Sequence, residues 1–158
     1  MAVVRCLMDL FKQPKDPLTQ WCTLRNRSCS GVSRNATASK ANDLEKRRIS
    51  FAGAIVRLSS KLPRTPQGRH ICGQILRSGT AAAANYGEAR GAESRADFIH
   101  KLKVVFKELN ETTVWLEVIA QSSLLSAETI VAILAENREL CRIIAASIKT
   151  ARASAEGL

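Results

Sequence analysis

One short stretch of this chain collects polar and glycine residues that could do chemistry. It reads AAAANYGEARGAES, residues 81–94, and it lies between segments whose apolar residues recur with helical spacing. A phosphate-binding loop would need Gly-x-x-x-x-Gly-Lys-Ser/Thr directly after a strand. The stretch has only Gly87 and Gly91, four residues apart, and no strand pattern precedes it. This spacing is typical of helix ends and close helix contacts, so we predict a joint between two helices.

The other residues with catalytic or metal-binding potential form no recognised constellation. His70 and His100 fall on different predicted helices, and neither belongs to a Glu-x-x-His pair of the kind that di-iron bundles use. Three glutamates are better interpreted as solvated or ion-paired side chains than as ligands: Glu108, Glu111 and Glu117. No Ser/His/Asp or Cys/His arrangement is indicated. We therefore predict a protein that is not an enzyme and has no metal or cofactor.

The five cysteines also lack a metal-binding pattern, because no two of them lie two to four residues apart. Their odd number argues against a disulfide framework. Cys72 and Cys141 fall on apolar helix positions, where a free cysteine acts as a small hydrophobic residue. This usage predicts a reducing, cytoplasmic location.

Four amphipathic helices must position these residues. The first is predicted from an N-cap at Asn42 or Asp43, and Pro63 and Pro66 end it. Its apolar stripe steps by seven, four, three and four residues, and Arg48 fills the missing position. The stripe consists of Leu44, Phe51, Ile55, Leu58 and Leu62.

The second helix changes from aliphatic to small and then to polar along its stripe. The stripe consists of Ile71, Ile75, Ser78, Ala82 and Asn85. Small residues let a neighbouring helix approach closely, which favours a packing face. Gly73, Gly79 and Gly87 each lower the intrinsic helix propensity by about 1 kcal/mol relative to alanine. This helix is therefore expected to depend on tertiary contacts.

Asn85 lies on the apolar line of the second helix, where a buried amide must find hydrogen-bond partners. Arg77 and Glu88 lie within two or three helical turns and could supply them. One buried polar group often fixes register and pairing in a bundle. We expect Asn85 to have that structural role, and direct contact with a ligand is the alternative.

The third and fourth helices carry the most regular patterns. The third follows Ser94, and its seam steps four, three, four without interruption over three heptads. Its seam residues are Phe98, Leu102, Val105, Leu109, Thr112, Leu116 and Ile119. The fourth begins at about Ser126, with Glu128 at its second position. Its seam residues are Ile130, Leu134, Asn137, Cys141, Ile144 and Ile148. With connections of roughly six to eight residues, these helices predict an all-α, antiparallel up-down four-helix bundle.

Composition and charge indicate how the chain is divided into domains. The chain has 158 residues, 46% apolar and 4% aromatic, and no apolar run approaches the roughly 18 residues of a membrane span. The net charge is +10, shared equally between residues 1–41 and residues 42–158. Residues 1–41 lack periodicity beyond a short amphipathic start and are acid-poor, so we interpret them as a flexible, disordered basic tail before a bundle at 42–158. An organellar transit peptide, or a translation start farther along the chain, is the alternative.

A further pattern runs from Leu76 to Ile119. It consists of an Arg-Ser pair, a few small residues, an Asn, a Glu near a Gly, and then a Ser before an aromatic helix start. The residues are Arg77, Ser78, Asn85, Glu88, Gly91, Ser94 and Phe98, followed by Glu111 and Trp115. This pattern resembles the family of four-helix bundle proteins encoded within 23S rRNA intervening sequences. The chain departs from the family in having only alanines where an aliphatic residue interrupts the small-residue run.

The resemblance covers about residues 42–155 and implies a bacterial bundle that assembles into a ring, commonly a homopentamer. The family is also similar to the accessory proteins of diversity-generating retroelements, whose basic barrels bind nucleic acid. The resemblance implies no catalytic activity and gives the motif residues a structural role.

A strongly basic chain favours polyanionic partners. Our leading hypothesis is a cytoplasmic homo-oligomer, expected to be a pentamer, that binds RNA or DNA through phosphate contacts without reading bases. The candidate contacts are Arg47, Arg48, Arg57, Lys101, Lys103 and Lys107. The main alternative is a structural or protein-docking scaffold whose charge only maintains solubility. A third is an enzyme with a site between subunits. No membrane and no small-molecule substrate is predicted as a partner.

Overall fold

The computed structural model describes the backbone of residues 34–156 and the side chains of residues 42–153. Four helices make up this part of the chain: α3 (Arg34–Ser59), α4 (Pro66–Arg90), α5 (Arg95–Gln121) and α6 (Ala127–Glu156). The described part of the chain contains no strand. None of its helices combines the length and hydropathy needed to cross a bilayer. The predicted all-α fold is confirmed.

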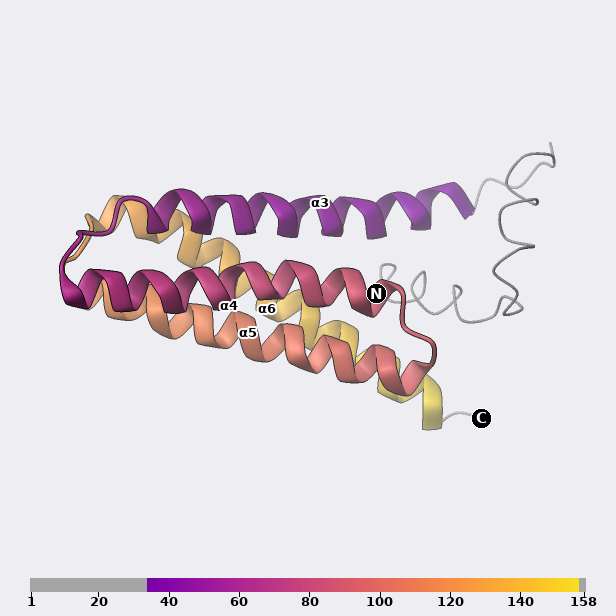
Figure 1. Cartoon of the computed structure of the whole chain (residues 1–158). Coiled ribbons are helices and arrows are strands. Elements are labelled where there is room, and N and C mark those ends of the chain that lie inside the picture. Colours follow the sequence, from indigo (N-terminus) through magenta and orange to yellow (C-terminus); the bar gives the residue numbers. More distant parts are fainter. Residues whose placement is uncertain (1–33, 157–158) are drawn as a thin grey trace.

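The helices form an antiparallel up-down bundle, as predicted, in which successive helices lie side by side (Figure 1). α4 packs most extensively on α5, and α3 and α6 pack least extensively of the neighbouring pairs. α6 starts beside the end of α3 and then crosses obliquely behind α4 and α5. The joints α3–α4 and α5–α6 therefore lie at one end of the bundle, and the joint α4–α5 lies at the other.

Local sequence signals explain most helix boundaries. Thr65 caps α4 by accepting a hydrogen bond from the Gly68 amide at 3.1 Å, and Pro66 occupies the first helical position. Ser94 caps α5 by accepting from the Asp97 amide at 3.1 Å. α6 begins directly after Ser126, as predicted. These caps satisfy backbone amides that have no partner within their own helix.

The predicted start of the first helix is wrong. α3 begins at Arg34, eight residues before Asn42, so neither Asn42 nor Asp43 is an N-cap. The Asn42 side chain instead accepts a hydrogen bond from Arg90 of α4 at 3.1 Å. Alanines and long polar residues in this segment favour continuation of the helix. The interpretation of the rest of the tail lies outside the described residues.

The predicted stripes form the core of the bundle, with two shifts. All seven seam residues of α5 are buried, and so are the five predicted stripe residues of the first helix, although Leu62 lies beyond the end of α3 at Ser59. In α6, Leu140 and Ala151 are fully buried, while Leu134 and Cys141 are only half-buried. The drift of an undistorted α-helix against a seven-residue repeat moves a buried line to later positions, so it does not explain the α6 shift from Cys141 to Leu140, which runs one position earlier.

Candidate functional site

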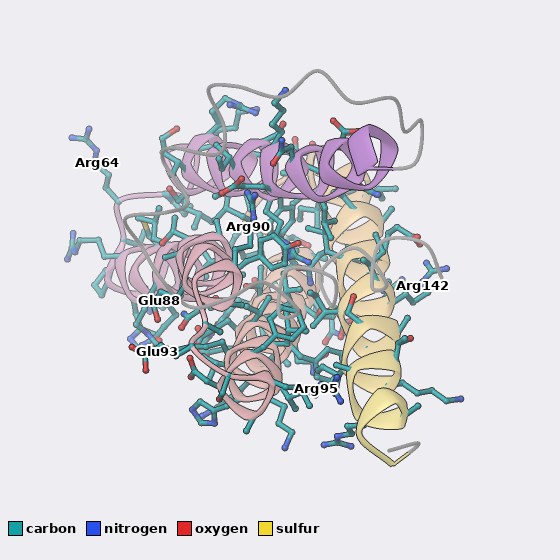
Figure 2. All side chains as sticks on the ribbon, turned by 90° about the vertical axis from the view of Figure 1, so that its right-hand side faces the viewer. Arg64, Glu88, Arg90, Glu93, Arg95 and Arg142 are labelled. Atoms are coloured by element: carbon teal, nitrogen blue, oxygen red, sulfur yellow. The ribbon has the colours of Figure 1, made fainter. Side chains whose placement is uncertain are left out.

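The stretch that joins α4 to α5 is a helix joint and not a ligand loop. α4 ends at Arg90, and the Gly91 amide donates to the Glu88 carbonyl oxygen at 3.0 Å. Ser94 then starts α5. Figure 2 looks along the bundle from this end and shows Arg90 lying between α3 and α4, where it forms an ion pair with Glu45 of α3. The polar residues of the joint therefore connect helices.

Asn85 does not have the buried role that we predicted. Its side chain is half-buried, and its Nδ2 donates to the Ala81 carbonyl oxygen of the same helix at 2.9 Å. The residue that enters the core is the next one, Tyr86, which is 1% exposed. The buried line of α4 passes from Ala82 to Tyr86 and then to Ala89, so it follows the helical drift described above.

The buried polar residues form contacts between other helix pairs. The Thr112 hydroxyl of α5 lies 3.1 Å from the Ser78 hydroxyl of α4, and both side chains are fully buried. Asn137 of α6 donates to the Leu109 carbonyl oxygen at 2.9 Å and to the Thr113 hydroxyl at 2.7 Å. Asn137, which lies on the predicted seam, thus has the register-setting position that we had assigned to Asn85.

Arg48 cannot contact a phosphate on the surface, because its side chain is only 2% exposed. Its guanidinium carbon lies 3.7 Å from the centroid of the Tyr86 ring, which is cation–π geometry. None of its three side-chain nitrogens has a hydrogen-bond partner among the residues that the structure describes. Burial lowers the pKa of Arg48 to about 10, and the charge of Arg47 acts in the same direction. The prediction of Arg48 as a nucleic-acid contact is wrong, since it follows the apolar stripe of α3 into the core.

Two of the other candidate cations are paired with acids. Arg47 of α3 donates from two nitrogens to the Glu136 carboxylate of α6, at 2.6 and 2.8 Å. Lys101 of α5 is paired with Glu88 of α4. These hydrogen-bonded carboxylates raise the pKa values of Arg47 and Lys101. A phosphate would have to compete with a carboxylate at both positions.

Arg57, Lys103 and Lys107 keep free charges. All three side chains are exposed, and none forms an ion pair with an acidic residue of the described part of the chain. Lys103 and Lys107 lie one turn apart on α5, whereas Arg57 lies near the end of α3. The structure therefore does not bring the six predicted contacts together on one surface.

The motif residues of α4 and α5 connect these two helices. Arg77 is paired with Glu111, which also accepts from the Trp115 indole nitrogen at 3.4 Å. The Trp115 ring packs edge-on against His70, with 6.0 Å between the ring centroids. Arg77 and Glu88 are therefore not partners of Asn85, as we had expected, because each points across to α5. Their contacts support a structural function for these residues.

Sequence reasoning missed a concentration of positive charge at the α3–α4 joint. Residues 46–87 contain eight Lys/Arg and no acidic residue, and this absence of acids was a readable signal. Four of these cations are exposed at the joint and form no ion pair with a described acid. We call them the basic end: Arg57, Lys61, Arg64 and Arg69. Figure 2 shows Arg64 projecting well clear of the helices.

Metal and thiol chemistry have little support in the described residues. No group of three or more His, Cys, Asp or Glu side chains in that part of the chain could hold a metal ion. Cys72 and Cys141 are free and half-buried. Burial raises the pKa of the Cys141 thiol, which disfavours the reactive thiolate.

The fold and the site together define an all-helical antiparallel bundle with ion-paired helix faces and one basic end. The chain belongs to the 23S rRNA-intervening sequence protein family, whose model matches residues 40–146. The resemblance that the α4–α5 motif suggested is thus confirmed.

A solved structure with the same fold is the crystal structure, at 1.70 Å, of a protein of unknown function from the S23 ribosomal protein family of Bacteroides thetaiotaomicron VPI-5482. It is 37% identical to this chain, with a TM-score of 0.65, and the match covers 70% of this chain and 98% of that one. A search of curated proteins finds no match to the chain.

Proposed function

We propose that this protein acts by binding and not by catalysis, as a homo-oligomeric bundle that holds RNA or DNA through phosphate contacts. The observation that carries the proposal is the basic end, where four exposed cations form no ion pair with any carboxylate of the described residues. Clustered unpaired Lys and Arg side chains release counterions when they bind phosphates, which drives sequence-independent binding.

The basic end replaces the scattered set of contacts as the main candidate interface. Arg57 belongs to both sets. Lys103 and Lys107 remain a second candidate surface on α5, while Arg47 and Lys101 would have to leave their carboxylate partners. Because exposed aromatic surface is scarce, we expect few stacking contacts with bases and therefore little sequence preference.

Self-assembly is the second part of the proposal. Ile49 is 61% exposed and Val56 is 48% exposed, and the two lie two turns apart on the same face of α3. A second copy of the chain would remove this apolar surface from water. The expected assembly is a homopentamer, a ring of five 17.3 kDa chains.

The experiment is a binding titration of the full chain with single-stranded RNA and DNA oligonucleotides over a series of salt concentrations. We expect the logarithm of affinity to fall linearly with the logarithm of salt, by about 0.7 for each phosphate contacted. Two matched charge reversals locate the contact: Arg64→Glu with Arg69→Glu at the basic end, and Lys103→Glu with Lys107→Glu on α5.

The basic-end pair should weaken binding by at least about tenfold, since removing and reversing two charges costs more than 1.4 kcal/mol. If only the α5 variant loses affinity, the proposed function stands and the interface lies at Lys103 and Lys107. If neither pair changes the affinity, the bundle is not the nucleic-acid-binding part of the chain and the proposal fails.

A protein-docking scaffold is the second candidate function, and the exposed Ile49 and Val56 favour it. Under that function the same titrations show no salt-sensitive binding to either nucleic acid.

A further inference from the structure

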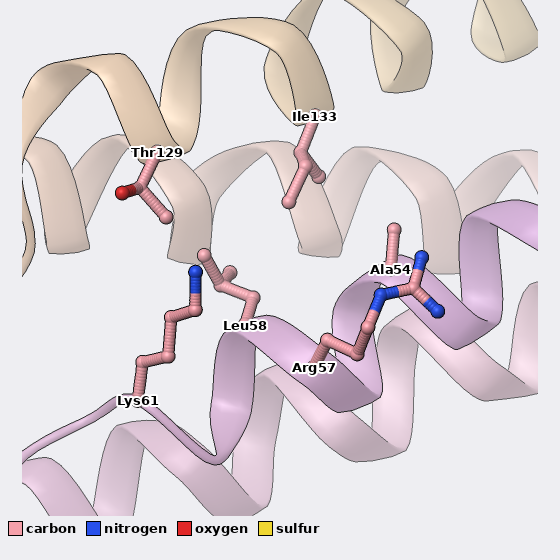
Figure 3. A pocket seen from close by; sticks show the side chains of 6 residues that line it. All are labelled: Ala54, Arg57, Leu58, Lys61, Thr129 and Ile133. Carbon is pink, nitrogen blue, oxygen red and sulfur yellow. The ribbon is translucent and has the colours of Figure 1, made fainter.

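A groove of about 340 Å³ lies at the basic end, between the end of α3 and the beginning of α6 (Figure 3). Its lining residues are Ala54, Arg57, Leu58, Lys61, Thr129 and Ile133. α3 and α6 pack less extensively than the other neighbouring helices. The groove is therefore an opening in the bundle's least tightly packed seam.

Two cations line this groove from the end of α3 and the turn that follows it. Arg57 lies in the last turn of α3 and Lys61 lies two residues beyond its end, with Leu58 between them (Figure 3). Neither forms an ion pair with a described acidic residue. Figure 3 shows the Arg57 guanidinium beside Ala54 and the Lys61 ammonium toward Thr129, so the two cations face the groove from different positions along it. An anion bound between them would be attracted by both charges.

The remaining lining strengthens an anion's interaction with these cations. Leu58 is 1% exposed, and with Ile133 it forms an apolar floor that excludes water from one side of the groove. Charges interact more strongly beside such a surface than in bulk water. Thr129 lies in the first turn of α6, where the helix dipole is positive, and Figure 3 shows the Lys61 ammonium approaching it. Glu128 precedes Thr129 but does not line the groove.

We propose that this groove is a phosphate-binding site with Arg57 and Lys61 as its cationic ligands; the Thr129 hydroxyl is not counted as a ligand, because it is hydrogen-bonded with the Ser126 hydroxyl at 3.0 Å. The phosphate can come from a nucleic-acid backbone or from free phosphate, since both present the same anionic oxygens. If the phosphate belongs to a nucleic acid, the site rests on the proposed function and gives it a point of contact. If it is free phosphate, the site does not depend on the proposed function.

The test uses the full chain with its Leu, Ile and Val methyl groups labelled for NMR. Sodium phosphate is titrated against sodium chloride at equal ionic strength. We expect saturable shifts of the Leu58 and Ile133 methyl signals with phosphate but not with chloride. The Val114 methyl signals, on an exposed face of α5, should not move.

Variants then assign the cations. Lys61→Gln should raise the apparent Kd for phosphate about fivefold, the usual upper effect of one exposed charge pair. Arg57→Gln with Lys61→Gln should abolish the saturable shift. The control is Lys103→Gln with Lys107→Gln, an exposed pair with the same spacing on α5, which should leave the phosphate Kd unchanged. All four residues are exposed, and an unchanged methyl spectrum elsewhere verifies the fold.

A second titration with a short oligothymidylate distinguishes the two sources. If it shifts the Leu58 and Ile133 signals and free phosphate competes with it, the groove holds backbone phosphate. If only free phosphate shifts them, the site exists but nucleic acid does not use it. If the oligonucleotide binds while these signals stay still under both titrants, the proposed function survives and the groove site is refuted. Equal phosphate shifts in the Arg57/Lys61 variant would also overturn the inference.

Discussion

Arg48 is a charged residue that lies in the apolar core of the bundle. Its side chain is 2% exposed, and its guanidinium has no hydrogen-bond acceptor within the described part of the chain. The Tyr86 ring supplies an attraction of about 2 kcal/mol, which is typical of a desolvated cation–π contact. The desolvation of a charge costs several kcal/mol, so the ring offsets only part of it.

Replacing Arg48 by leucine should therefore stabilise the protein. Arg48→Leu keeps apolar volume against Tyr86 and removes the buried charge, so we expect the free energy of unfolding to rise by about 1–3 kcal/mol. Chemical denaturation at constant protein concentration measures the change. Arg47→Leu at the next position is the control, because it removes only an exposed ion pair and should cost less than about 1 kcal/mol. A stability loss with Arg48→Leu would show that the guanidinium has an acceptor outside the described residues.

The buried guanidinium also predicts a pH dependence. Its pKa is lowered from its ordinary value to about 10, so the unfolded chain binds more protons than the folded chain once the pH exceeds about 10. The free energy of unfolding should therefore rise as the pH increases above about 10, because the buried guanidinium loses its charge. Below about pH 10 the cost of burying the charged group should be constant. The full effect is on the order of 3 kcal/mol. The stability difference between wild type and Arg48→Leu should narrow from pH 10 upward, and a constant difference would contradict the shift.

At the scale of the helix, the close contact between α3 and α4 depends on one glycine. A Cβ added at Gly79 would lie 2.8 Å from two side-chain carbons of Ile55, whose side chain is fully buried. A Cβ at Gly73 on the exposed face of the same helix would meet nothing within 4 Å. Only the first of these glycines is required by packing.

This pair of glycines gives a matched test. Gly79→Ala should lower the free energy of unfolding by about 1–3 kcal/mol, because Ile55 has no room to move. Gly73→Ala should raise it by about 0.5–1 kcal/mol through the better helix propensity of alanine. Both values come from chemical denaturation. Equal effects of the two substitutions would mean that α3 does not pack on α4 at Gly79.

At the scale of the whole molecule, charge and apolar surface are placed separately. The basic end lies at the α3–α4 joint, while the opposite joint mixes Glu88 and Glu93 with Arg90 and Arg95 (Figure 2). Ile49 and Val56 leave an apolar strip on α3 between them. This separation suits a molecule that assembles through one surface and binds a polyanion through another.

The mass of the assembly tests this division. Ile49→Lys with Val56→Lys should lower the light-scattering mass from a multiple of 17.3 kDa toward the single chain, because two charges cannot be buried in an apolar contact. Val114→Lys on α5 is the control, since it places the same charge on another exposed valine, and it should keep the assembly. An unchanged mass in the double variant would place the interface on another face.

The residue pattern by itself determined the class of the fold. The seven-residue seam of α5 and the stripe of the first predicted helix were predicted from spacing alone, and every residue of both is buried. The helix starts after Ser94 and after Ser126 were readable for the same reason. Helical periodicity and capping are local, since each depends on residues within a turn or two of one another.

Only the tertiary structure decided what each polar residue does. It moved the buried position of α4 from Asn85 to Tyr86, gave the register contact to Asn137, and placed Arg48 in the core. It also neutralised Arg47 through Glu136, 89 residues away, and left Arg57 and Lys61 together in a groove. These outcomes depend on how four helices cross and on which side chains then meet. No single helix's pattern contains that geometry, because it is set by the sum of contacts between all of them.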